Sequence, residues 1–578
     1  MKKNRQHAPE LNSRPNQLFR FHPRYFWFIL GVIIIAGFGL RAADLRADPP
    51  PDLSWSFAPY TDESLNTYSA RNFSLYGRWK MDDFLPFVIY PLVNVFVALI
   101  YKILGIGFVQ VKLLSLISGA LSILILALFF RTEKNPAPAL LSALLLATCY
   151  PLVMYSRLGL VESLEILFLL LTGFFWVQGL RRPGLMTAAG FCAAATVLLV
   201  KLSAVFLVPV MLILIVSELP AFPNRKRMTT TLLYFSAGVI IASLCWLLLV
   251  YLPYRKEYLQ YAVRHSSESP AGHPRTLSAY LFNTFTFGLR SRLIPRMIWT
   301  ALLGYLTLPW LGRSQSRLLR YTLLWFIFGL LMLGYMNYRP PRYEIILLPC
   351  LLIAAAAALC RILENGTIIP QTRPTVIKTL LYGIWLSPVV LQLMLYSSGF
   401  RNYPQPDGES GIIIFSLIIG LALAFAGYGL LRFRKKGWTI RPGWLRGALV
   451  GLILILSLRL DIGQWSAWFT NRTYDLITYS KAVDRLLPDN AVVAGPWAPP
   501  VMIESRKRAI AVTDWANLDD LFRRFAVTHL ILGEGETDRL LWERVSPVVK
   551  EKTKKLLQFR IRGQLISVLA LNDSLSGH

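Results

Sequence analysis

Long apolar runs separated by short polar connections dominate the chain as far as residue 460. Most of these runs are 15–22 residues long, and an α-helix needs about 20 apolar residues to cross a bilayer. We therefore predict a polytopic α-helical membrane protein with about 13 transmembrane helices. The runs occupy residues 25–43, 112–130, 137–155, 163–180, 185–200, 202–217, 231–253, 297–312, 321–336, 343–360, 376–396, 411–431 and 446–460.

A further apolar segment, residues 84–107, does not fit this series. If it crossed the membrane, every later connection would change sides, and the basic connections would face outward. We predict instead that it forms a helix that lies in the membrane interface or re-enters the membrane. It then belongs to a long first external loop, residues 44–111, and a second external loop covers residues 254–296.

Lysine and arginine residues mark one side of the membrane. They gather at the N-terminus and in alternate short connections, and such basic loops face the cytoplasm. The basic stretches are residues 1–7, 131–134, 181–184, 224–228, 313–320 and 432–446. With the N-terminus inside and an odd number of spans, the C-terminus lies outside. We expect an integral protein of the bacterial cytoplasmic (inner) membrane.

The composition changes after the last apolar run. There, short β-type runs alternate with amphipathic helical stretches, as in a small α/β domain. The strand-like runs are residues 490–495, 508–512, 528–533 and 564–571, and the helical stretches are 472–487 and 517–525. The sequence thus predicts a transmembrane domain of residues 1–462 and a soluble extracytoplasmic α/β domain of residues 463–578.

The charge of the chain indicates an anionic partner at a membrane. Hydrophobic residues make up 54% and charged residues only 16% of the chain, yet its net charge is +29. Basic cytoplasmic loops account for part of this charge, and the rest favours a phosphate or a phospholipid headgroup as partner. Nucleic acid is not expected, because the basic residues are dispersed and form no stripe. All five cysteines lie in predicted spans, which excludes a disulfide framework and a zinc site.

Two adjacent carboxylates, Asp62 and Glu63, stand in the first external loop. A carboxylate can act as a general base toward a hydroxyl or an amine, or it can hold a divalent cation. The alternative is structural, because Thr61 or Asp62 could open a helix as its N-cap. The pair alone does not decide between a catalytic site and a cap.

A second acidic group lies at the same predicted membrane face. Arg157 ends the third apolar run, Glu162 begins the fourth, and Glu165 lies one helical turn deeper. Charged groups at membrane depth are costly unless they are paired or functional. We therefore expect either part of a substrate site or a structural ion pair between Arg157 and Glu162.

Cationic residues on this face suit a phosphate. Arg339 and Arg342 stand with Tyr343 at the start of the tenth apolar run, and the planar donor fork of arginine fits phosphate oxygens. The alternative is an arginine that anchors the helix by reaching toward the headgroups. Lys201, between two runs, can supply a second cation, and Arg71 follows the carboxylate pair in the first loop.

His265 lies in the second external loop, eight residues before His273. Such histidines can bind a metal or the substrate, although at this spacing in a loop they are more often ordinary loop residues. A divalent cation held by Asp62, Glu162 or His265 is an open option. The sequence indicates no other cofactor.

With these motifs in place, the chain resembles the GT-C membrane glycosyltransferases, specifically glycosyltransferase family 39. That family includes the protein O-mannosyltransferases and the lipid A aminoarabinose transferase. The resemblance covers nearly the whole chain and rests on the order of "TDESLNTYSAR", "YSRLGLVESLEIL" and "RPPRYEIILLP". The span count and the external C-terminal domain resemble the aminoarabinose-transferring branch.

The resemblance implies roles for individual residues. Asp62, with Glu63, would form the acidic site of the first loop, and Glu162 would be the acidic residue of the second. Arg342 and Tyr343 match a late Arg-Tyr motif that faces the lipid phosphate.

The chain departs from the family at one position. Relatives commonly carry His-Pro-Pro or Lys-Pro where this chain has Tyr90-Pro91. The charged donor contact expected there is missing, and we expect Tyr90 itself to be a substrate-binding residue.

The leading hypothesis is an inverting glycosyltransferase. It would move a sugar from a polyprenyl-phosphate donor to a lipid, glycan or protein acceptor on the extracytoplasmic face. The expected catalytic residues are Asp62, Glu63 and Glu162, and the expected substrate-binding residues are Arg71, Tyr90, Arg157, Lys201, His265, Arg339, Arg342 and Tyr343. One alternative, a transporter or lipid flippase, would place ionisable residues along a path through the spans; the other is a catalytically inactive relative.

Overall fold

The helices of the protein follow the predicted apolar runs. The computed structural model describes residues 23–54, 56–132, 136–222, 224–267, 276–288, 298–311, 316–336, 340–366, 375–397, 410–433, 439–513 and 515–571. The longer helices are α1 (Pro23–Ala42), α5 (Gln110–Thr132), α6 (Pro136–Thr148), α8 (Glu162–Gly179), α9 (Leu185–Ala195), α10 (Leu207–Glu218), α11 (Arg225–Trp246), α15 (Ile298–Leu311), α16 (Arg317–Gly334), α18 (Leu348–Asn365), α19 (Val376–Ser397), α20 (Ser410–Phe433) and α21 (Gly443–Thr470). Every predicted run coincides with at least one of them.

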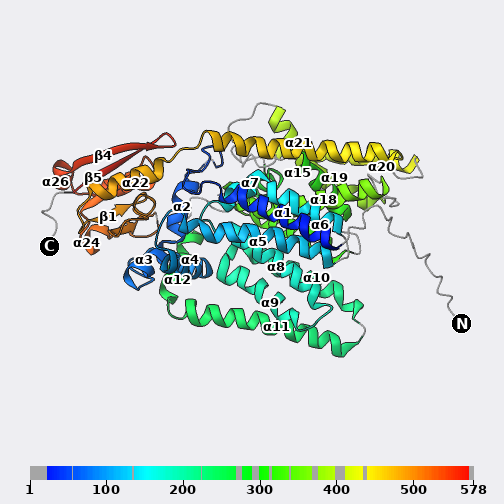
Figure 1. Ribbon diagram of the computed structural model, residues 1–578, viewed down its shortest axis with the longest axis horizontal. Coiled ribbons are helices and arrows are strands. Elements are labelled where there is room, and N and C mark those ends of the chain that lie inside the picture. The colour runs from blue at the N-terminus through cyan, green and yellow to red at the C-terminus, as the bar shows by residue number, and fades with distance from the viewer. Residues whose placement is uncertain are drawn as a thin grey trace.

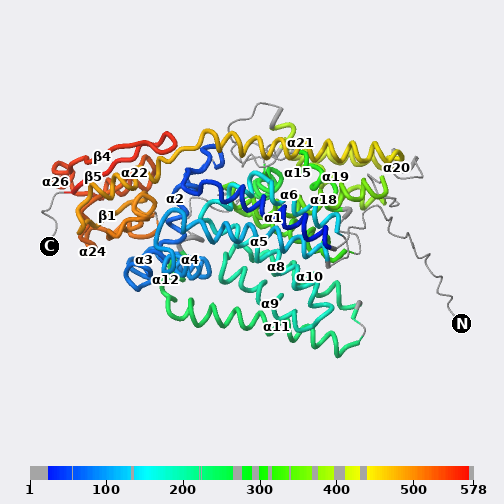
Figure 2. The backbone as a smooth tube through the Cα atoms, in the orientation of Figure 1, coloured from blue at the N-terminus to red at the C-terminus, as the bar shows by residue number. Residues whose placement is uncertain are grey.

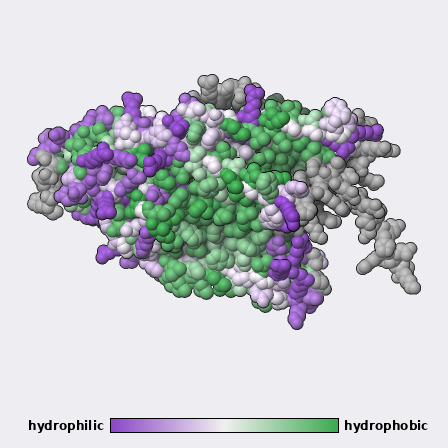
Figure 3. All heavy atoms as spheres, viewed as in Figure 1, coloured by the Kyte–Doolittle hydropathy of each residue, from purple (hydrophilic) through white to green (hydrophobic). Residues whose placement is uncertain are grey.

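These helices form an elongated bundle with an apolar belt. Within the described part of the chain, eight helices are long and apolar enough to cross a membrane, and a ninth is added if one bent pair counts as a single span. Hydrophobic residues cover the middle of the molecule, and hydrophilic residues gather at its two ends (Figure 3). The predicted class, a polytopic α-helical membrane protein, is confirmed. The number of crossings stays a prediction.

Helices at the centre and the rim of the bundle differ in burial. In the most apolar 18-residue stretch of Pro341–Asn365, which includes α18, 89% of the residues are buried, against 17% in Arg225–Tyr251, which includes α11. α11 packs closely on α9 at two glycines, Gly190 of α9 and Gly238 of α11. A Cβ atom at either position would lie only 2.0 Å from a backbone carbonyl oxygen of the other helix. Small residues allow this close approach of apolar helices.

The run at residues 137–155 is bent rather than straight. α6 and α7 (Tyr150–Ser156) meet at 61°. Pro151 carries no N–H for the helical ladder, and the N–H of Tyr150 donates instead to Asp461 on α21, at 2.9 Å. Two carbonyl groups in the last turn of α6 accept from the guanidinium of Arg41. The single span expected there is therefore a bent pair, and these three backbone groups at the bend find partners outside the helix.

The first loop is folded and lies between the bundle and the C-terminal domain (Figure 1). It contains α2 (Ala58–Asn66), α3 (Tyr68–Tyr76), the 3₁₀ turn η2 (Pro86–Val88) and α4 (Pro91–Leu104). α4 has 14 residues, which is too short for a perpendicular crossing. Its position in the membrane interface stays a prediction. The second loop contains α12 (Arg255–Ser267) and α13 (Leu277–Phe285).

The C-terminal domain is built on one sheet of five strands. Its strands are β1 (Val492–Gly495), β2 (Arg508–Ala511), β3 (His529–Leu532), β4 (Lys554–Ile561) and β5 (Gln564–Ala570), in the order β2-β1-β3-β5-β4. β1 is parallel to β2 and β3, and β5 is antiparallel to β3 and β4. Its helices are α22 (Asp475–Leu486), α23 (Ala498–Val501), α24 (Leu521–Arg524), α25 (Glu536–Arg544) and α26 (Pro547–Lys552). The predicted small α/β domain is confirmed.

Two details of this domain differ from the sequence reading. β4 was not predicted, because it is an edge strand rich in Lys, Gln and Arg, and edge strands tolerate charge. It pairs with β5 through a turn in which Arg562 and Gly563 both have positive φ, 50° and 80°. The expected boundary at 462 falls inside α21, which continues to Thr470 and carries the chain to the sheet domain (Figure 2).

Candidate active site

Four segments far apart in the sequence meet at one end of the bundle. They are α2, which carries Asp62; the first turn of α8, which begins with Glu162; a break in the helical chain at Lys201; and the short helix α17 (Pro341–Glu344), which carries Arg342. We call these four residues the carboxylate site. This is the end of the bundle at which the C-terminal domain lies (Figure 1).

The carboxylate site is a chain of ion pairs. The guanidinium of Arg342 contacts the carboxylate of Asp62. Its Nε lies 3.9 Å from Oε1 of Glu162, and Nζ of Lys201 lies 2.7 Å from the same oxygen. These side chains are 2–16% exposed. Buried charges of opposite sign stabilise one another strongly only when they remain in contact.

A local break in the helix directs Lys201 into the site. The π-helical turn η3 (Thr196–Val200) ends just before Lys201, and the 3₁₀ turn η4 (Leu202–Phe206) begins just after it. Lys201 itself is extended, with φ −160° and ψ 125°. Breaks of this kind are common at functional sites. Here the break brings an amine to the carboxylates of α8.

The first turn of α8 holds a second buried carboxylate, Glu165. It is 0% exposed, and one of its oxygens lies 3.8 Å from Nζ of Lys201. Among the described residues, neither of its oxygens has a hydrogen-bond partner. Glu162 and Glu165 both lie at the positive end of the helix dipole, which favours negative charge. Lys201 thus faces two carboxylates.

Aromatic side chains cover the two cations. Nζ of Lys201 lies 4.1 Å from the ring centre of Tyr343, and the guanidinium of Arg342 lies 5.2 Å from it. Such contacts add cation–π stabilisation. Tyr90 and Tyr261 each interact electrostatically with Tyr343, and Tyr90 also does so with Glu162. Tyr90 therefore lies near this site.

Glu63 lies in a separate contact beside the carboxylate site. Its carboxylate is buried, and Oε2 lies 3.9 Å from Nζ of Lys112 on α5. Burial raises the pKa of Glu63, against the opposing effects of Lys112 and the backbone of Gly159. The two adjacent carboxylates thus face different partners, Asp62 an arginine and Glu63 a lysine.

Two predicted substrate-binding residues lie elsewhere. Arg71 donates to three backbone carbonyl groups of the C-terminal domain. Arg157 donates to carbonyl groups of residues 40–44, where α1 ends. The alternative of an Arg157–Glu162 ion pair is wrong, since Glu162 pairs with Lys201. Arg71 and Arg157 are therefore not part of the proposed site, because each guanidinium already donates hydrogen bonds to backbone carbonyl groups.

The structural alternatives for Asp62 and Arg342 also fail. α2 begins at Ala58 with Phe57 as its N-cap, so neither Thr61 nor Asp62 caps the helix. Arg342 is directed at Asp62, and its side chain is only 11% exposed. An arginine that anchored the helix would extend toward the headgroups instead.

Some expected site residues lie outside the described part. These are Arg339, His273 and the side chain of His265, whose backbone belongs to α12. Among the described residues, no three His, Cys, Asp or Glu side chains come close enough to hold a metal ion. Asp62 and Glu162 face Arg342 and Lys201 instead of each other. The two cations of the site suit the oxygens of an organic phosphate.

Sequence reasoning missed three residues around the site. Lys112 stands at the start of an apolar helix, and a charge at that depth is itself a signal. The side chain of Asn94 on α4 makes three hydrogen bonds within the first loop, to Ala70, Asn66 and Tyr90, and the residue is 0% exposed. Tyr261 comes from the second loop, and no local pattern distinguishes it from its neighbours.

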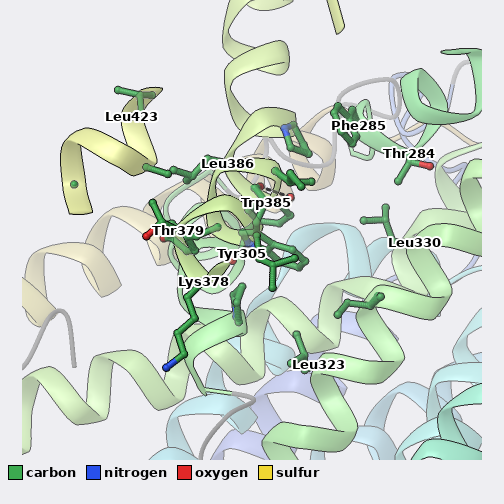
Figure 4. A pocket seen from close by; sticks show the side chains of 18 of the residues that line it. Thr284, Phe285, Tyr305, Leu323, Leu330, Lys378, Thr379, Trp385, Leu386 and Leu423 are labelled. Carbon is green, nitrogen blue, oxygen red and sulfur yellow. Dashed lines mark hydrogen bonds between the residues drawn. The ribbon is translucent and has the colours of Figure 1, made fainter. Parts of the chain in front are cut away.

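A cavity of about 520 Å³ lies apart from the carboxylate site. It is formed mainly by α15, α16, α19 and α20, and its lining is largely apolar, with Lys378 at one edge pointing away from Trp385 and Leu386 (Figure 4). It contains none of the residues of the carboxylate site.

The helix bundle, the folded first loop and the C-terminal domain together make the GT-C fold of membrane glycosyltransferases. The crystal structure of ArnT from Cupriavidus metallidurans bound to undecaprenyl phosphate is similar to this chain, with a TM-score of 0.57 at 14% identity; the match covers 96% of this chain and 99% of that chain. The apo state of the same protein gives the same values. The resemblance to this fold covers nearly the full length of both chains.

A family model supports the same assignment over part of the chain. Residues 86–251 match the family described as dolichyl-phosphate-mannose-protein mannosyltransferase. The archaeal oligosaccharyltransferase AglB from Archaeoglobus fulgidus, in complex with an inhibitory peptide and a dolichol-phosphate, has a TM-score of 0.45 at 13% identity, covering 95% of this chain and 74% of that chain. No curated protein matches the sequence. The predicted resemblance to the GT-C glycosyltransferases of family 39 is confirmed.

Proposed function

We propose that this protein is an inverting glycosyltransferase that uses a polyprenyl-phosphate-linked sugar. The observation that carries the proposal is the carboxylate site, in which Arg342 and Lys201 face Asp62 and Glu162 at one end of the bundle. Two cations suit a phosphate, and a carboxylate suits an acceptor hydroxyl or amine. The crystal structure of ArnT bound to undecaprenyl phosphate supports a donor of that class.

The charges of the site match the charges of this reaction. A polyprenyl-phosphate sugar is a phosphodiester with one negative charge. When the bond between the anomeric carbon and the phosphate oxygen breaks, the leaving polyprenyl phosphate carries a second negative charge. Arg342 and Lys201 can stabilise this charge as it develops, which is the kind of interaction that lowers a reaction barrier.

Asp62 is the proposed general base. In the structure its carboxylate contacts the guanidinium of Arg342. A donor phosphate would compete with Asp62 for that guanidinium and so leave the carboxylate ready to take the acceptor's proton. The acceptor then attacks the anomeric carbon directly, one bond forms as the other breaks, and the configuration inverts. Glu162 holds Lys201 in place for the leaving group.

The arrangement of ionisable groups favours an enzyme over a transporter. Glu162 begins α8, Lys201 stands in a helix break, and Arg342 lies in a helix of four residues. A transporter would distribute such residues along a path through its spans. Here they meet at one end of the bundle.

We also propose that the N-terminus is cytoplasmic and that the carboxylate site and the C-terminal domain are extracytoplasmic. The basic connections support this orientation. Single cysteines at positions 436 and 520, tested with a membrane-impermeant thiol reagent on intact cells, should react only at 520. Labelling of both from the same side would contradict the proposed topology.

The enzyme assay offers polyprenyl-phosphate-linked hexoses and pentoses to the purified protein together with extracted envelope lipids. Mass spectrometry should detect free polyprenyl phosphate and a glycosylated acceptor with one of these donors. Envelope glycans and glycolipids of cells with and without the protein identify the product. If no donor is consumed and both glycan profiles are the same, the chain is an inactive relative and the proposal fails.

A further inference from the structure

The first loop is held by the C-terminal domain through groups that the proposed reaction does not use. α3 follows α2 after a single residue, Thr67. Its buried side chains reach residues 503–509 of the C-terminal domain, more than 430 positions later in the chain. α2 itself packs on α23 of that domain. The helix that carries Asp62 is therefore in contact with the soluble domain.

Arg71 makes the central contact of this docking surface. Its Nε donates to the carbonyl oxygen of Ile503 at 3.2 Å, and its Nη2 donates to those of Ser505 at 2.5 Å and Lys507 at 3.1 Å. The side chain is 3% exposed. A buried guanidinium is costly unless its donors are satisfied; Nε and Nη2 are, whereas Nη1 has no hydrogen-bond partner among the described residues. The three carbonyl groups belong to the backbone of one short segment, so this carbonyl cage holds Arg71 in a defined position.

A second contact lies one turn earlier on α3. The hydroxyl of Tyr68 is within hydrogen-bond distance of the carboxylate of Asp82, at 2.5 Å, and of the carbonyl oxygen of Ala509, at 2.7 Å. Asp82 also accepts from the side chain of Asn517 at 3.0 Å. Tyr68 is 1% exposed. α3 is thus held at two successive turns.

The junction between the two helices links α3, which contacts the C-terminal domain, to α2, which carries Asp62. The hydroxyl of Thr67 donates to the carbonyl of Glu63 at 2.6 Å, and the N–H of Arg71 donates to the carbonyl of Thr67 at 3.0 Å. From α4, the amide of Asn94 accepts from Ala70 and donates to Asn66, each at 3.0 Å. These bonds tie the two helices to each other and to α4.

We propose that the C-terminal domain sets the position of Asp62, and that Arg71 is the positioning residue through which it does so. The unit of α2 and α3 is held by Asn94 of α4 at Asn66 and Ala70, and by the carbonyl cage at Arg71. Asp62 lies on α2, which also packs on α23 of the C-terminal domain. The role of Arg71 rests on the proposed function, but its effect on the order of α2 does not depend on any reaction.

The first test measures hydrogen exchange in the full-length protein. Arg71→Met keeps much of the side-chain volume and removes all the donors. Amide hydrogens of residues 58–66 should then exchange at least about ten-fold faster, because local opening becomes easier, while those of α18 at the bundle centre stay unchanged. Exchange in α2 equal to that of the wild type would overturn the proposal.

The matched control is Tyr76→Phe. Tyr76 lies on the same helix, and its hydroxyl donates to the carbonyl of Arg506 at 3.2 Å from an exposed position. This variant removes one contact to the same segment at the rim of the docking surface. It should leave both the exchange of residues 58–66 and the transfer rate as in the wild type. Equal acceleration by both variants would show general undocking and overturn the special role of Arg71.

The second test separates positioning from folding. A misplacement of about 1 Å can cost on the order of 100-fold in rate, so kcat of Arg71→Met per folded molecule should fall on the order of 10–100-fold. KM for the donor should stay within about two-fold, since Arg71 does not contact it. Arg71→Lys, which restores one donor, should recover part of the rate. A lower thermal midpoint with unchanged kcat would overturn the positioning role.

The two proposals fail in different ways. If the wild type transfers no sugar, the proposed function fails, and the exchange experiment still decides whether the domain orders α2. If the wild type is active and Arg71→Met has wild-type kcat and exchange, only the positioning proposal fails.

Discussion

Buried cations occupy two regions of this protein and have different partners in each. In the carboxylate site, Arg342 and Lys201 face side-chain carboxylates. At the end of α1 and under the C-terminal domain, Arg157 and Arg71 donate to backbone carbonyl groups. We call the second kind carbonyl cages.

The difference in partners separates binding from scaffolding. A carboxylate that pairs with a cation can be displaced by another anion, such as a phosphate, so the cation remains available to a ligand. A carbonyl group is part of the fixed backbone and carries only a partial charge. A guanidinium surrounded by carbonyls therefore holds the chain together, and its removal leaves buried acceptors unpaired. Substitutions in the carboxylate site should mainly change donor binding and catalysis, and substitution of Arg157 should mainly change stability. Arg71 differs from Arg157 because its cage also positions the helix that carries Asp62.

The largest expected effect is that of Asp62→Asn. Loss of a general base typically lowers the rate about 10²–10⁴-fold. The substitution is nearly isosteric, and the side chain of Asp62 is 16% exposed, the most exposed of the four in the site. Expression and the thermal midpoint should therefore change little. Product formation in a deletion strain carrying matched amounts of protein measures this. Full complementation by the variant would reduce Asp62 to a structural residue.

Arg342→Ala should weaken donor binding more than folding. A lost charge-assisted hydrogen bond to phosphate costs about 1.5–3 kcal/mol, which corresponds to roughly 10- to 150-fold in the Kd for the donor. Titration of purified wild type and variant with a polyprenyl-phosphate sugar gives the two affinities. Unchanged affinity together with a large loss of thermal stability would move Arg342 into the scaffolding group.

Arg157→Met should show the reverse behaviour. Its guanidinium donates to the carbonyl groups of Arg41 and Asp44, each at 2.9 Å, and stacks on Trp468 with 4.2 Å to the ring centre. Loss of these contacts should cost about 1–3 kcal/mol of stability. The thermal midpoint in detergent should fall, while the donor Kd of the folded fraction stays the same. A changed Kd with an unchanged midpoint would contradict the comparison.

The smallest expected effect is the pH dependence of the docking surface. Burial raises the pKa of Asp82 to about 6, although Tyr68, Asn517 and the N–H of Phe84 favour its charged form. The folded protein therefore keeps this proton at pH values where the unfolded chain, with a pKa near 4, has lost it. Stability from Asp82 is greatest below pH 4 and falls by about 2 kcal/mol as the pH rises to 6.

Asp82→Asn removes this dependence. The stability difference between wild type and variant, measured by thermal unfolding in detergent, should therefore change by about 2 kcal/mol between pH 4 and pH 6. Asp83→Asn is the matched control, because Asp83 pairs with Arg524 at a more exposed position. A constant difference for Asp82→Asn over this pH range would show that the pKa of Asp82 is not raised in the folded protein.

The sequence by itself determined the class of the protein and most of its helices. Apolar runs near bilayer length permit few other structures, because backbone groups in a membrane must be paired within the segment. The change from long apolar runs to a pattern of alternating strands and helices likewise predicted the C-terminal domain. The carboxylates and the Arg-Tyr pair were visible as charged residues at the ends of apolar runs, where charge is costly without a use.

Only the tertiary structure decided which charged residues belong together. Arg71, Arg157 and Arg342 look alike in sequence, since each stands in a short polar segment beside an apolar one. The partners of Arg71 lie 432–436 positions away, Asp62 lies 280 positions from Arg342, and the partners of Arg157 lie 113–117 positions away. No local pattern encodes such distances. The helix break that directs Lys201 and the edge position that makes β4 a strand are likewise products of packing, because both depend on neighbours far along the chain.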